Sequence, residues 1–255
     1  MTNIIEASNI NKKVELDKGH ELHILKDVNL VIKKGEFVSV MGPSGSGKST
    51  LLYNLSGMDR VSSGSVVFQG HELGSLKEDE LAKIRLKYMG FIFQDINLLK
   101  NLSVIDNVMF PALVSKGVVK NKVLQKARKL LQMTGIDKLE NHQITQASGG
   151  QLQRVGICRA LINNPDIIFG DEPTGALDSK STEDILSILG EISSTGTTVM
   201  LVTHDVKVAA KTERVLFMKD GNLVAEKKMK KFDHLQDDSK EREESIMKWM
   251  VKNGF

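Results

Sequence analysis

The chain has 255 residues, of which 40% are hydrophobic, and this size suits one large α/β domain, alone or with a subdomain. Its formal net charge of +3 does not by itself imply a polyanionic partner. Cys158 is the only cysteine, which excludes an intrachain disulfide and agrees with a reducing compartment. The sequence begins without a signal-peptide pattern, and no apolar run approaches the ~18 residues that cross a bilayer. Any role at a membrane is therefore expected to depend on a partner.

Three strands are predicted over residues 3–9, 22–32 and 36–41, with a hairpin-like loop at Asp17–His20 between the first two. The third strand leads into a stretch that fits G-x-x-x-x-G-K-[ST], and a helical run follows at 51–55. Glycines there let backbone amides turn onto phosphate oxygens, and the helix start adds its dipole. The flanking strand and helix favour a phosphate-binding loop over an ordinary turn. Its residues are Gly42, Pro43, Ser44, Gly45, Ser46, Gly47, Lys48, Ser49 and Thr50.

Within that loop, Lys48 is expected to reach the β- and γ-phosphates of a nucleotide, and Ser49 is expected to hold Mg²⁺. A short strand at 65–70, a charged helix at 78–87 and a buried strand at 89–94 come next. Residues 95–147 are then helical by pattern, and Asn107 and Pro111 shorten the first helix. We expect a helical subdomain of about 95–160 inserted into the core.

The core is predicted to resume with a helix at 151–163, a strand at 166–170, a helix at 180–193, a strand at 197–202 and a hairpin at 214–225. This alternation around a phosphate loop predicts an α/β fold with a mostly parallel sheet, right-handed crossovers and N-terminal antiparallel strands. Residues 227–255 are a charge run that ends in an apolar stretch at 246–251. A solvated tail with a short docking helix is favoured over a dedicated partner site.

An acidic pair, Asp171-Glu172, ends the predicted strand at 166–170. An acid in this place, combined with a phosphate loop, is typical of a magnesium site. Asp171 is expected to hold Mg²⁺, and Glu172 to orient or deprotonate the attacking water. Read alone, an acidic pair before Pro173 is equally compatible with a simple turn.

A second candidate anion site precedes the helix at 151–163 and consists of Ser148, Gly149, Gly150 and Gln151. One nucleotide cannot easily use two outward-facing helix starts of the same subunit. Two chains arranged head to tail, each offering this loop to the other's γ-phosphate, would solve the problem. Read alone, the stretch is better explained as an ordinary helix cap.

Together these residues resemble the nucleotide-binding subunit of ATP-binding cassette (ABC) transporters, over about residues 4–226. The resemblance implies an ATPase domain at 1–226, with ATP and Mg²⁺ as cofactors. It implies that Gln94 meets Mg²⁺ and senses a membrane partner, that Ser148–Gln151 is the family signature, and that Glu172 is the catalytic base. It also implies that Asp178 lies in a loop crossing a dimer interface and that His204 contacts the γ-phosphate.

Two positions depart from the family pattern. Ala147 stands where the signature usually opens with Leu, which would loosen local packing but leave the phosphate contacts. Val14 stands where an aromatic side chain usually stacks on adenine, so weaker base binding is expected.

Within the family, Gly90–Gln94 and Asp171–Ser179 look like the lipoprotein-release and macrolide-export group. Asp95–Leu99 and Ser179–Ser181 look more like its bacitracin and lantibiotic resistance branch. The resemblance implies a cytoplasmic ATPase, peripheral on the inner face of the membrane, that dimerises on MgATP and powers a separate permease.

Three alternatives use the same nucleotide motifs. Two are a lipoprotein- or macrolide-type export ATPase and an ATP-gated regulator of a membrane complex without transport. The third, nucleic-acid maintenance or translation, is disfavoured because the chain has one phosphate loop and no sustained heptads. No nucleic-acid partner is expected.

Overall fold

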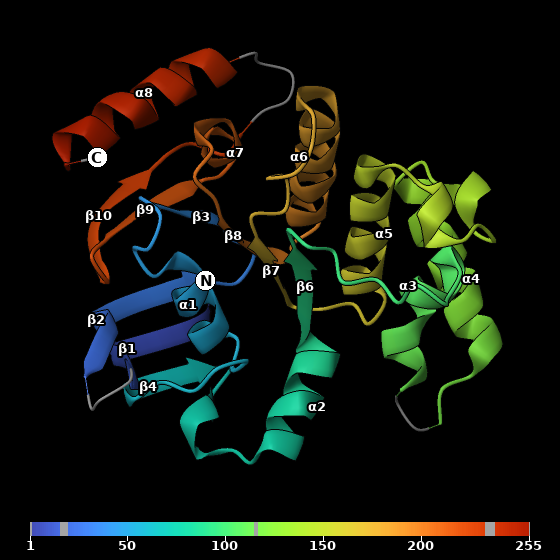
Figure 1. The fold of residues 1–255 in the computed structure, drawn as a ribbon, viewed down its shortest axis with the longest axis horizontal. Helices are drawn as coiled ribbons and strands as arrows, with labels where there is room; N and C mark the ends of the chain where they lie inside the picture. The colour runs from blue at the N-terminus through green and yellow to red at the C-terminus, as the bar shows by residue number, and fades with distance from the viewer. Residues whose placement is uncertain (1, 16–19, 115–116, 233–237, 255) are drawn as a thin grey trace.

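The computed structural model describes residues 2–15, 20–114, 117–232 and 238–254, and it contains two sheets (Figure 1). The first is antiparallel, with the order β2-β1-β4-β5; the second has six strands in the order β10-β9-β3-β8-β7-β6. All neighbours in the second sheet are parallel except the β9–β10 hairpin. The predicted fold class, with N-terminal antiparallel strands beside a mostly parallel core, is confirmed.

The antiparallel sheet is formed by β1 (Asn3–Glu15), β2 (Glu21–Lys33), β4 (Ser63–Phe68) and β5 (His71–Glu72). The parallel core is formed by β3 (Phe37–Met41), β6 (Met89–Phe93), β7 (Ile167–Asp171) and β8 (Thr198–Val202), and is extended by β9 (Arg214–Lys219) and β10 (Asn222–Lys228). The helices are α1 (Lys48–Leu55), α2 (Glu78–Tyr88), α3 (Val104–Leu113), α4 (Lys120–Met133), α5 (Gly149–Leu161), α6 (Ser179–Ser194), α7 (Val206–Ala210) and α8 (Ser239–Lys252).

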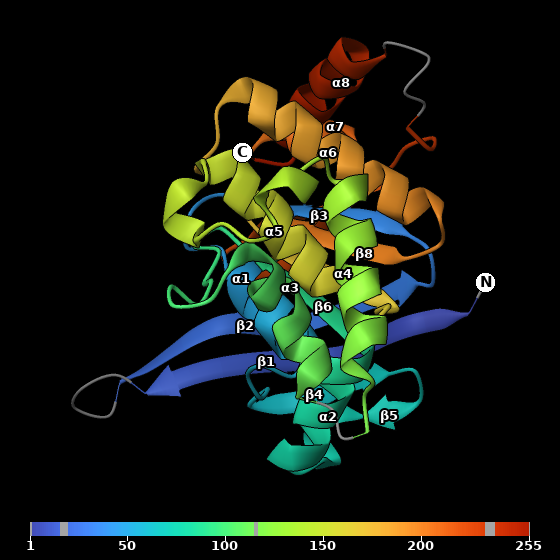
Figure 2. The same ribbon diagram turned by 90° about the vertical axis from the view of Figure 1, so that its right-hand side faces the viewer.

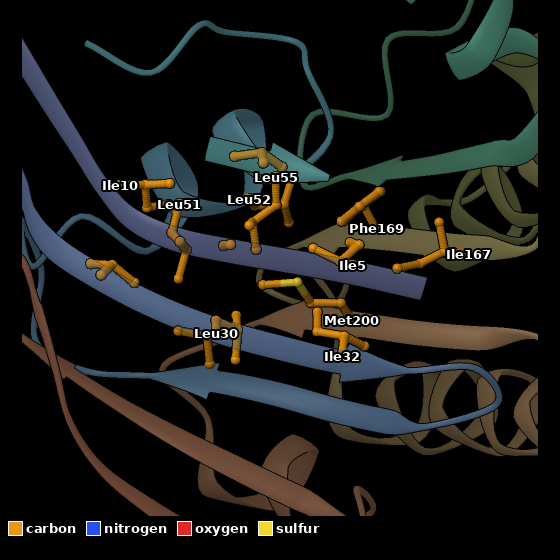
Figure 3. Close-up of a cluster of buried hydrophobic side chains, with 14 of the residues drawn as sticks. Ile5, Ile10, Leu30, Ile32, Leu51, Leu52, Leu55, Ile167, Phe169 and Met200 are labelled. Carbon is orange, nitrogen blue, oxygen red and sulfur yellow. The ribbon is translucent and has the colours of Figure 1, made fainter. Parts of the chain in front are cut away.

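One large apolar core joins the two sheets around α1 (Figure 3). Leu51, Leu52 and Leu55 of α1 are fully buried there. They lie between strands of the antiparallel sheet, represented by Ile5 and Leu30, and the face of the parallel sheet that carries Phe169 and Met200 (Figure 3). Burying a Leu or Ile side chain contributes roughly 1.5–3 kcal/mol, so this cluster fixes the helix that follows the phosphate loop.

Helices α3, α4 and α5 pack side by side and share a separate apolar cluster (Figure 2). Val108, Ala127, Leu131, Val155 and Cys158 are buried within it. Ser103 caps α3, and Pro111 lies inside that helix near its end. Because these helices share an apolar core of their own, we propose that they form a subdomain inserted at about 95–160.

Strand β1 differs most from the sequence prediction. It continues to Glu15, whereas the predicted strand ended at residue 9. Asn9 has a φ of +48° and the pairing with β2 shifts register nearby, so the strand bends without ending. The Asn11 side chain also bonds Asp27 of β2, which accounts for polar residues inside the strand. Of the predicted loop at Asp17–His20, residues 17–19 lie outside the described part of the chain.

The C-terminal end is more ordered than the predicted solvated tail. Strand β10 takes in Lys227 and Lys228, and α8 begins at Ser239, well before the apolar stretch that suggested a short helix. Ile246 and Met250 are buried, and the Trp249 ring meets Phe217 of β9 edge-on. Helix α8 lies over β9 and against α7 (Figure 1).

Candidate active site

Four neighbouring parallel strands, in the order β3, β8, β7 and β6, end at the same edge of the sheet. Each leads directly into predicted site residues: the 42–50 loop after β3, His204 after β8, Asp171-Glu172 at the end of β7, and Gln94 after β6. The carboxyl edge of an open α/β sheet is where ligands bind. The sheet order therefore brings together residues that are more than 160 positions apart in sequence.

The loop after β3 depends on two of its glycines. A Cβ on Gly42 would lie 2.0 Å from the carbonyl oxygen of Met218, so no side chain fits at this position. Gly47 is the N-cap of α1 and has a φ of +96°, a left-handed conformation that favours glycine. These constraints shape the turn that leads the chain into α1.

The Lys48 side chain is 8% exposed and folds back onto this loop. Its ammonium donates hydrogen bonds to the carbonyls of Gly42 at 2.9 Å and Pro43 at 2.8 Å. Burial lowers the Lys48 pKa, and the nearby charges of Glu172 and Asp171 oppose that shift. An anionic group entering the loop would offer this cation a stronger partner than two carbonyls.

Two hydroxyl groups of α1 bind the Asp171 carboxylate. Ser49 Oγ donates to Oδ1 at 2.8 Å, and the Tyr53 hydroxyl donates to Oδ2 at 2.8 Å. Burial, then the hydrogen bond and the charge of Asp171, raise the Tyr53 pKa to about 12. The sequence analysis did not identify Tyr53. The available signal was its position four residues after Ser49, which puts both on one face of a helix.

Glu172 and His204 are in direct contact, because His204 Nδ1 lies 3.0 Å from Glu172 Oε1. Glu172 has a φ of +45°, uncommon for a residue with a side chain. Its N–H donates to the Val202 carbonyl of β8 at 2.9 Å, which holds the backbone in this conformation. Strained backbone of this kind concentrates at functional sites.

Gln94 reaches the same group of side chains. A Cβ built on Gly175 would lie 3.2 Å from Gln94 Nε2 and 3.3 Å from Glu172 Oε2, so both side chains approach this glycine. Gln94 is exposed at the end of β6. The predicted catalytic residues Glu172, His204 and Gln94 thus lie together, and their roles remain predictions.

A cavity of about 790 Å³ opens over the 42–50 loop and includes Glu172 and His204 in its wall. Its far side is formed by Leu22 and Ile24 of β2, which the sequence analysis did not identify. Val14 pairs directly with Leu22 across the β1–β2 register. Side chains in this part of the wall are aliphatic, so a nucleotide base placed here would meet an apolar surface.

We expect Val14→Tyr to tighten ATP binding by about 1 kcal/mol, or roughly fivefold, because an aromatic ring would stack on the base. Calorimetric titration of ATP into both proteins measures the change. Val31→Tyr is a matched control, since Val31 and Val14 are 38% and 39% exposed, but Val31 pairs with Glu6 whereas Val14 pairs with Leu22 of the cavity wall. Equal affinities of Val14→Tyr and the parent chain would contradict base binding at this end of β1 and β2.

The second candidate anion site lies elsewhere. Ser148 caps α5, and its N–H donates to Gln151 Oε1 at 2.8 Å in a reciprocal capping box. None of Ser148, Gly149, Gly150 and Gln151 lines the cavity over the 42–50 loop. A Cβ on Gly150 would instead lie 2.8 Å from Ser181 Oγ of α6. Within one chain this site therefore lies beside the start of α6 and not at the 42–50 loop.

Asp178 marks the start of α6. Its carboxylate accepts hydrogen bonds from the Ser181 N–H at 3.0 Å and the Ser181 hydroxyl at 2.7 Å. These bonds lower the Asp178 pKa. Asp178 is thus a helix cap in the isolated chain, and its role at a dimer interface remains a prediction.

The donor set suits a hard cation that also binds phosphate. Ser49 and Asp171 place a hydroxyl and a carboxylate oxygen 2.8 Å apart, and no group of three or more His, Cys, Asp or Glu side chains forms a metal cage among the described residues. Mg²⁺ is commonly held by one or two protein oxygens together with substrate phosphates and water. Ser46 Oγ, buried in the same loop, has no hydrogen-bond partner in the described chain, which agrees with a loop shaped to receive a polar ligand.

Comparison with known proteins agrees with this geometry. A family model described as ABC transporter matches residues 25–175. An uncharacterized ABC transporter ATP-binding protein of Methanocaldococcus jannaschii is 44% identical over 235 residues, which cover 90% of this chain and 99% of that protein. A bacitracin export ATP-binding protein of Halalkalibacterium halodurans is 43% identical over 221 residues, which cover 86% of this chain and 87% of that protein.

Other relatives are much longer. A macrolide export ATP-binding/permease protein of Pasteurella multocida is 43% identical over 226 residues, which are 88% of this chain but 34% of that protein. This chain thus spans about a third of such relatives.

Among solved structures, a dimeric ATP-binding cassette in a post-hydrolysis state, bound to ADP and Pi, superposes with a TM-score of 0.83 at 41% identity. The match covers 89% of this chain and 100% of that one. On the family model, the full-length relatives and the fold, the chain belongs to the ABC transporter family and is an ABC ATPase.

Proposed function

We propose that this ATPase closes with a second copy of itself around two MgATP and thereby drives a separate membrane permease, in antimicrobial peptide resistance or export. The observation that supports it most is the separation of the two candidate phosphate sites. The cavity over the 42–50 loop contains none of Ser148–Gln151, and both helix starts are accessible at the surface of one chain. A second copy supplies the missing half.

Head-to-tail pairing under two-fold symmetry would place Ser148–Gln151 of each chain over the 42–50 loop of the other. Ser181 and Asp178 would be brought to the same interface as that segment, because Gly150 is packed against Ser181. Dimers are also described for the solved cassettes that this chain resembles. Those dimers motivate the same arrangement here.

In the proposed site, Lys48 exchanges the Gly42 and Pro43 carbonyls for phosphate oxygens, and Ser49 and Asp171 hold Mg²⁺. The bound cation would neutralise charge on the phosphates. Glu172 accepts the proton of the attacking water as general base. The water oxygen forms a new bond to the γ-phosphorus as the bond to the ADP oxygen breaks.

His204 imposes a condition on this step. An ionised Glu172 only accepts hydrogen bonds, so His204 Nδ1 donates to it across the 3.0 Å contact. A neutral ring then has an acceptor at Nε2, which cannot donate to a phosphate oxygen. The ring must release Glu172 or carry a second proton before it binds the γ-phosphate.

The permease is proposed to dock in a groove of about 400 Å³ between the core and helices α3 and α5. Phe91 and Phe93 of β6 line it together with Met58 and Pro111. Arg159 of α5 donates to the carbonyls of Ile96 and Asn97, just after Gln94. A movement of this groove would therefore be transmitted to the loop after Gln94 and to the site.

Among the described residues, no helix has the length and apolarity to cross a bilayer. Docked on its permease, the ATPase is proposed to lie at the cytoplasmic face of the membrane.

Met58→Glu tests the docking surface. Met58 is 42% exposed, so the change is expected to leave folding intact while a charge in the groove disrupts permease binding. The measurement is detergent pull-down of the native permease with the tagged ATPase. Met247→Glu is the matched control, because Met247 is 56% exposed on α8, away from the groove. Equal recovery of the permease with both variants would count against the groove.

The substrate class is tested with the purified complex in lipid nanodiscs. We expect bacitracin-type peptides to raise its ATPase rate and macrolides to leave it unchanged. Stimulation by a macrolide alone would favour the macrolide-type alternative. A co-purified membrane protein with no substrate path would favour an ATP-gated regulator.

A further inference from the structure

Tyr53 connects the phosphate-loop helix to the acidic end of β7. It lies one helical turn after Ser49, so both hydroxyls emerge from the same face of α1. Ser49 Oγ and the Tyr53 hydroxyl each bind one oxygen of Asp171, both at 2.8 Å. The carboxylate is thus gripped at both oxygens by one helix. The Tyr53 ring is packed against the buried core around α1, which fixes its position.

We propose that Tyr53 is a positioning residue for metal binding: it holds Asp171 through Oδ2 so that Oδ1 stays directed at Ser49 and the Mg²⁺ site. The inference rests on the proposed role of Ser49 and Asp171 as magnesium ligands. Tyr53 itself takes no part in the ligand set.

The contact is suited to this role for two reasons. An O–H bond to an ionised carboxylate is among the stronger hydrogen bonds, roughly twice as strong as one between neutral groups. A carboxylate held at one oxygen can rotate about its Cβ–Cγ bond, whereas one held at both cannot turn away from the cation. Groups that orient a ligand in this way typically change metal affinity or activity by about 10–100-fold when removed.

Tyr53→Phe removes the hydroxyl and keeps the ring that packs against the core. Asp171 then keeps only its bond to Ser49, and we expect metal binding to weaken. The natural control is Tyr88→Phe, since Tyr88 is the only other tyrosine of the chain and lies against Phe68, away from the site. Both changes delete one phenolic oxygen.

The measurement is Mn²⁺ affinity by electron paramagnetic resonance with ATP present, in the Glu172→Gln background so that ATP is not consumed. We expect the Mn²⁺ dissociation constant to rise about tenfold in Tyr53→Phe and to stay unchanged in Tyr88→Phe. ATP affinity measured in excess chelator should be equal in all three proteins, because Tyr53 does not line the cavity over the 42–50 loop.

The outcomes separate this inference from the proposed function. Equal Mn²⁺ affinity in Tyr53→Phe and its parent would overturn the positioning role. The positioning role would also be overturned if Tyr53→Phe lost as much ATP affinity in excess chelator as it lost Mn²⁺ affinity. The substitution would then disturb the whole 42–50 loop and not the metal site alone. A parent that binds ATP but shows no Mn²⁺ binding would instead refute the magnesium site of the proposed function.

Discussion

Glu172→Gln is expected to bind ATP at least as well as the parent chain while its hydrolysis rate falls by ~10²-fold or more, the scale of general-base catalysis. Glutamine keeps the shape of the side chain and the contact with His204, but it cannot accept the proton of water. The change also removes one negative charge near the γ-phosphate. With hydrolysis blocked, we expect an ATP-bound dimer to accumulate, and size-exclusion chromatography with and without MgATP measures it.

Lys48→Ala provides the comparison for that experiment. Lys48 is the buried cation of the phosphate loop, so its loss should prevent nucleotide binding and leave the protein monomeric in MgATP. The two variants should therefore fail at different steps. A Glu172→Gln protein that stays monomeric in ATP and hydrolyses at near the parent rate would show that both the base assignment and the two-chain site are wrong.

The core strands could be predicted from sequence because each is a short, continuous apolar run. β3, β7 and β8 are almost entirely buried, and the residues that follow them carry the predicted chemistry. Parallel strands share a carboxyl edge, so the motifs that follow the predicted strands were enough to place Lys48 and Glu172 in one site. His204 was expected there only from the family resemblance.

Other parts of the site could not be placed from the position of an apolar strand. Leu22 and Ile24 reach the cavity only through the long β1–β2 hairpin, whose polar stretch reads as a loop in isolation. The contact of Tyr53 with Asp171 joins residues 118 positions apart and depends on how α1 packs on β7. The positive φ of Glu172 is set by its bond to β8, which no local pattern encodes.

Helix α8, at the C-terminal end, also makes contacts that could not be predicted from the sequence. Its apolar positions predicted a docking helix, and Ile246 and Met250 are buried as such a helix requires, but a charged residue that the sequence analysis did not identify is buried beside them. Arg242 is 8% exposed and donates to three backbone carbonyls, those of Ala210 at 2.6 Å, Thr212 at 2.8 Å and Lys230 at 3.0 Å. Two of these belong to the end of α7 and the residues after it, where helix carbonyls lack partners within the helix.

Arg242→Ala should accordingly lower the free energy of unfolding by about 3 kcal/mol, because each buried carbonyl left without a partner costs ~1–3 kcal/mol. That loss corresponds to a melting temperature lower by roughly 6–12 °C for a chain of this size. Deleting residues 238–255 should cost more, since it also exposes the apolar surface around Phe217 that Ile246, Trp249 and Met250 cover. Thermal denaturation followed by circular dichroism measures both changes.

Lys248→Ala is the control, because it removes a basic side chain of the same helix that is 80% exposed, and its melting temperature should stay close to that of the parent. Arg242→Lys should recover only part of the loss, since one ammonium cannot reproduce the guanidinium fork that reaches carbonyls on both sides.

Helix α7 begins directly after His204, so loosening its far end should disturb that side chain while the 42–50 loop stays intact. ATP affinity is therefore expected to survive truncation, while the ATPase rate and dimer formation fall. An unchanged melting temperature and an unchanged ATPase rate in the truncated protein would mean that α8 is a passive appendage.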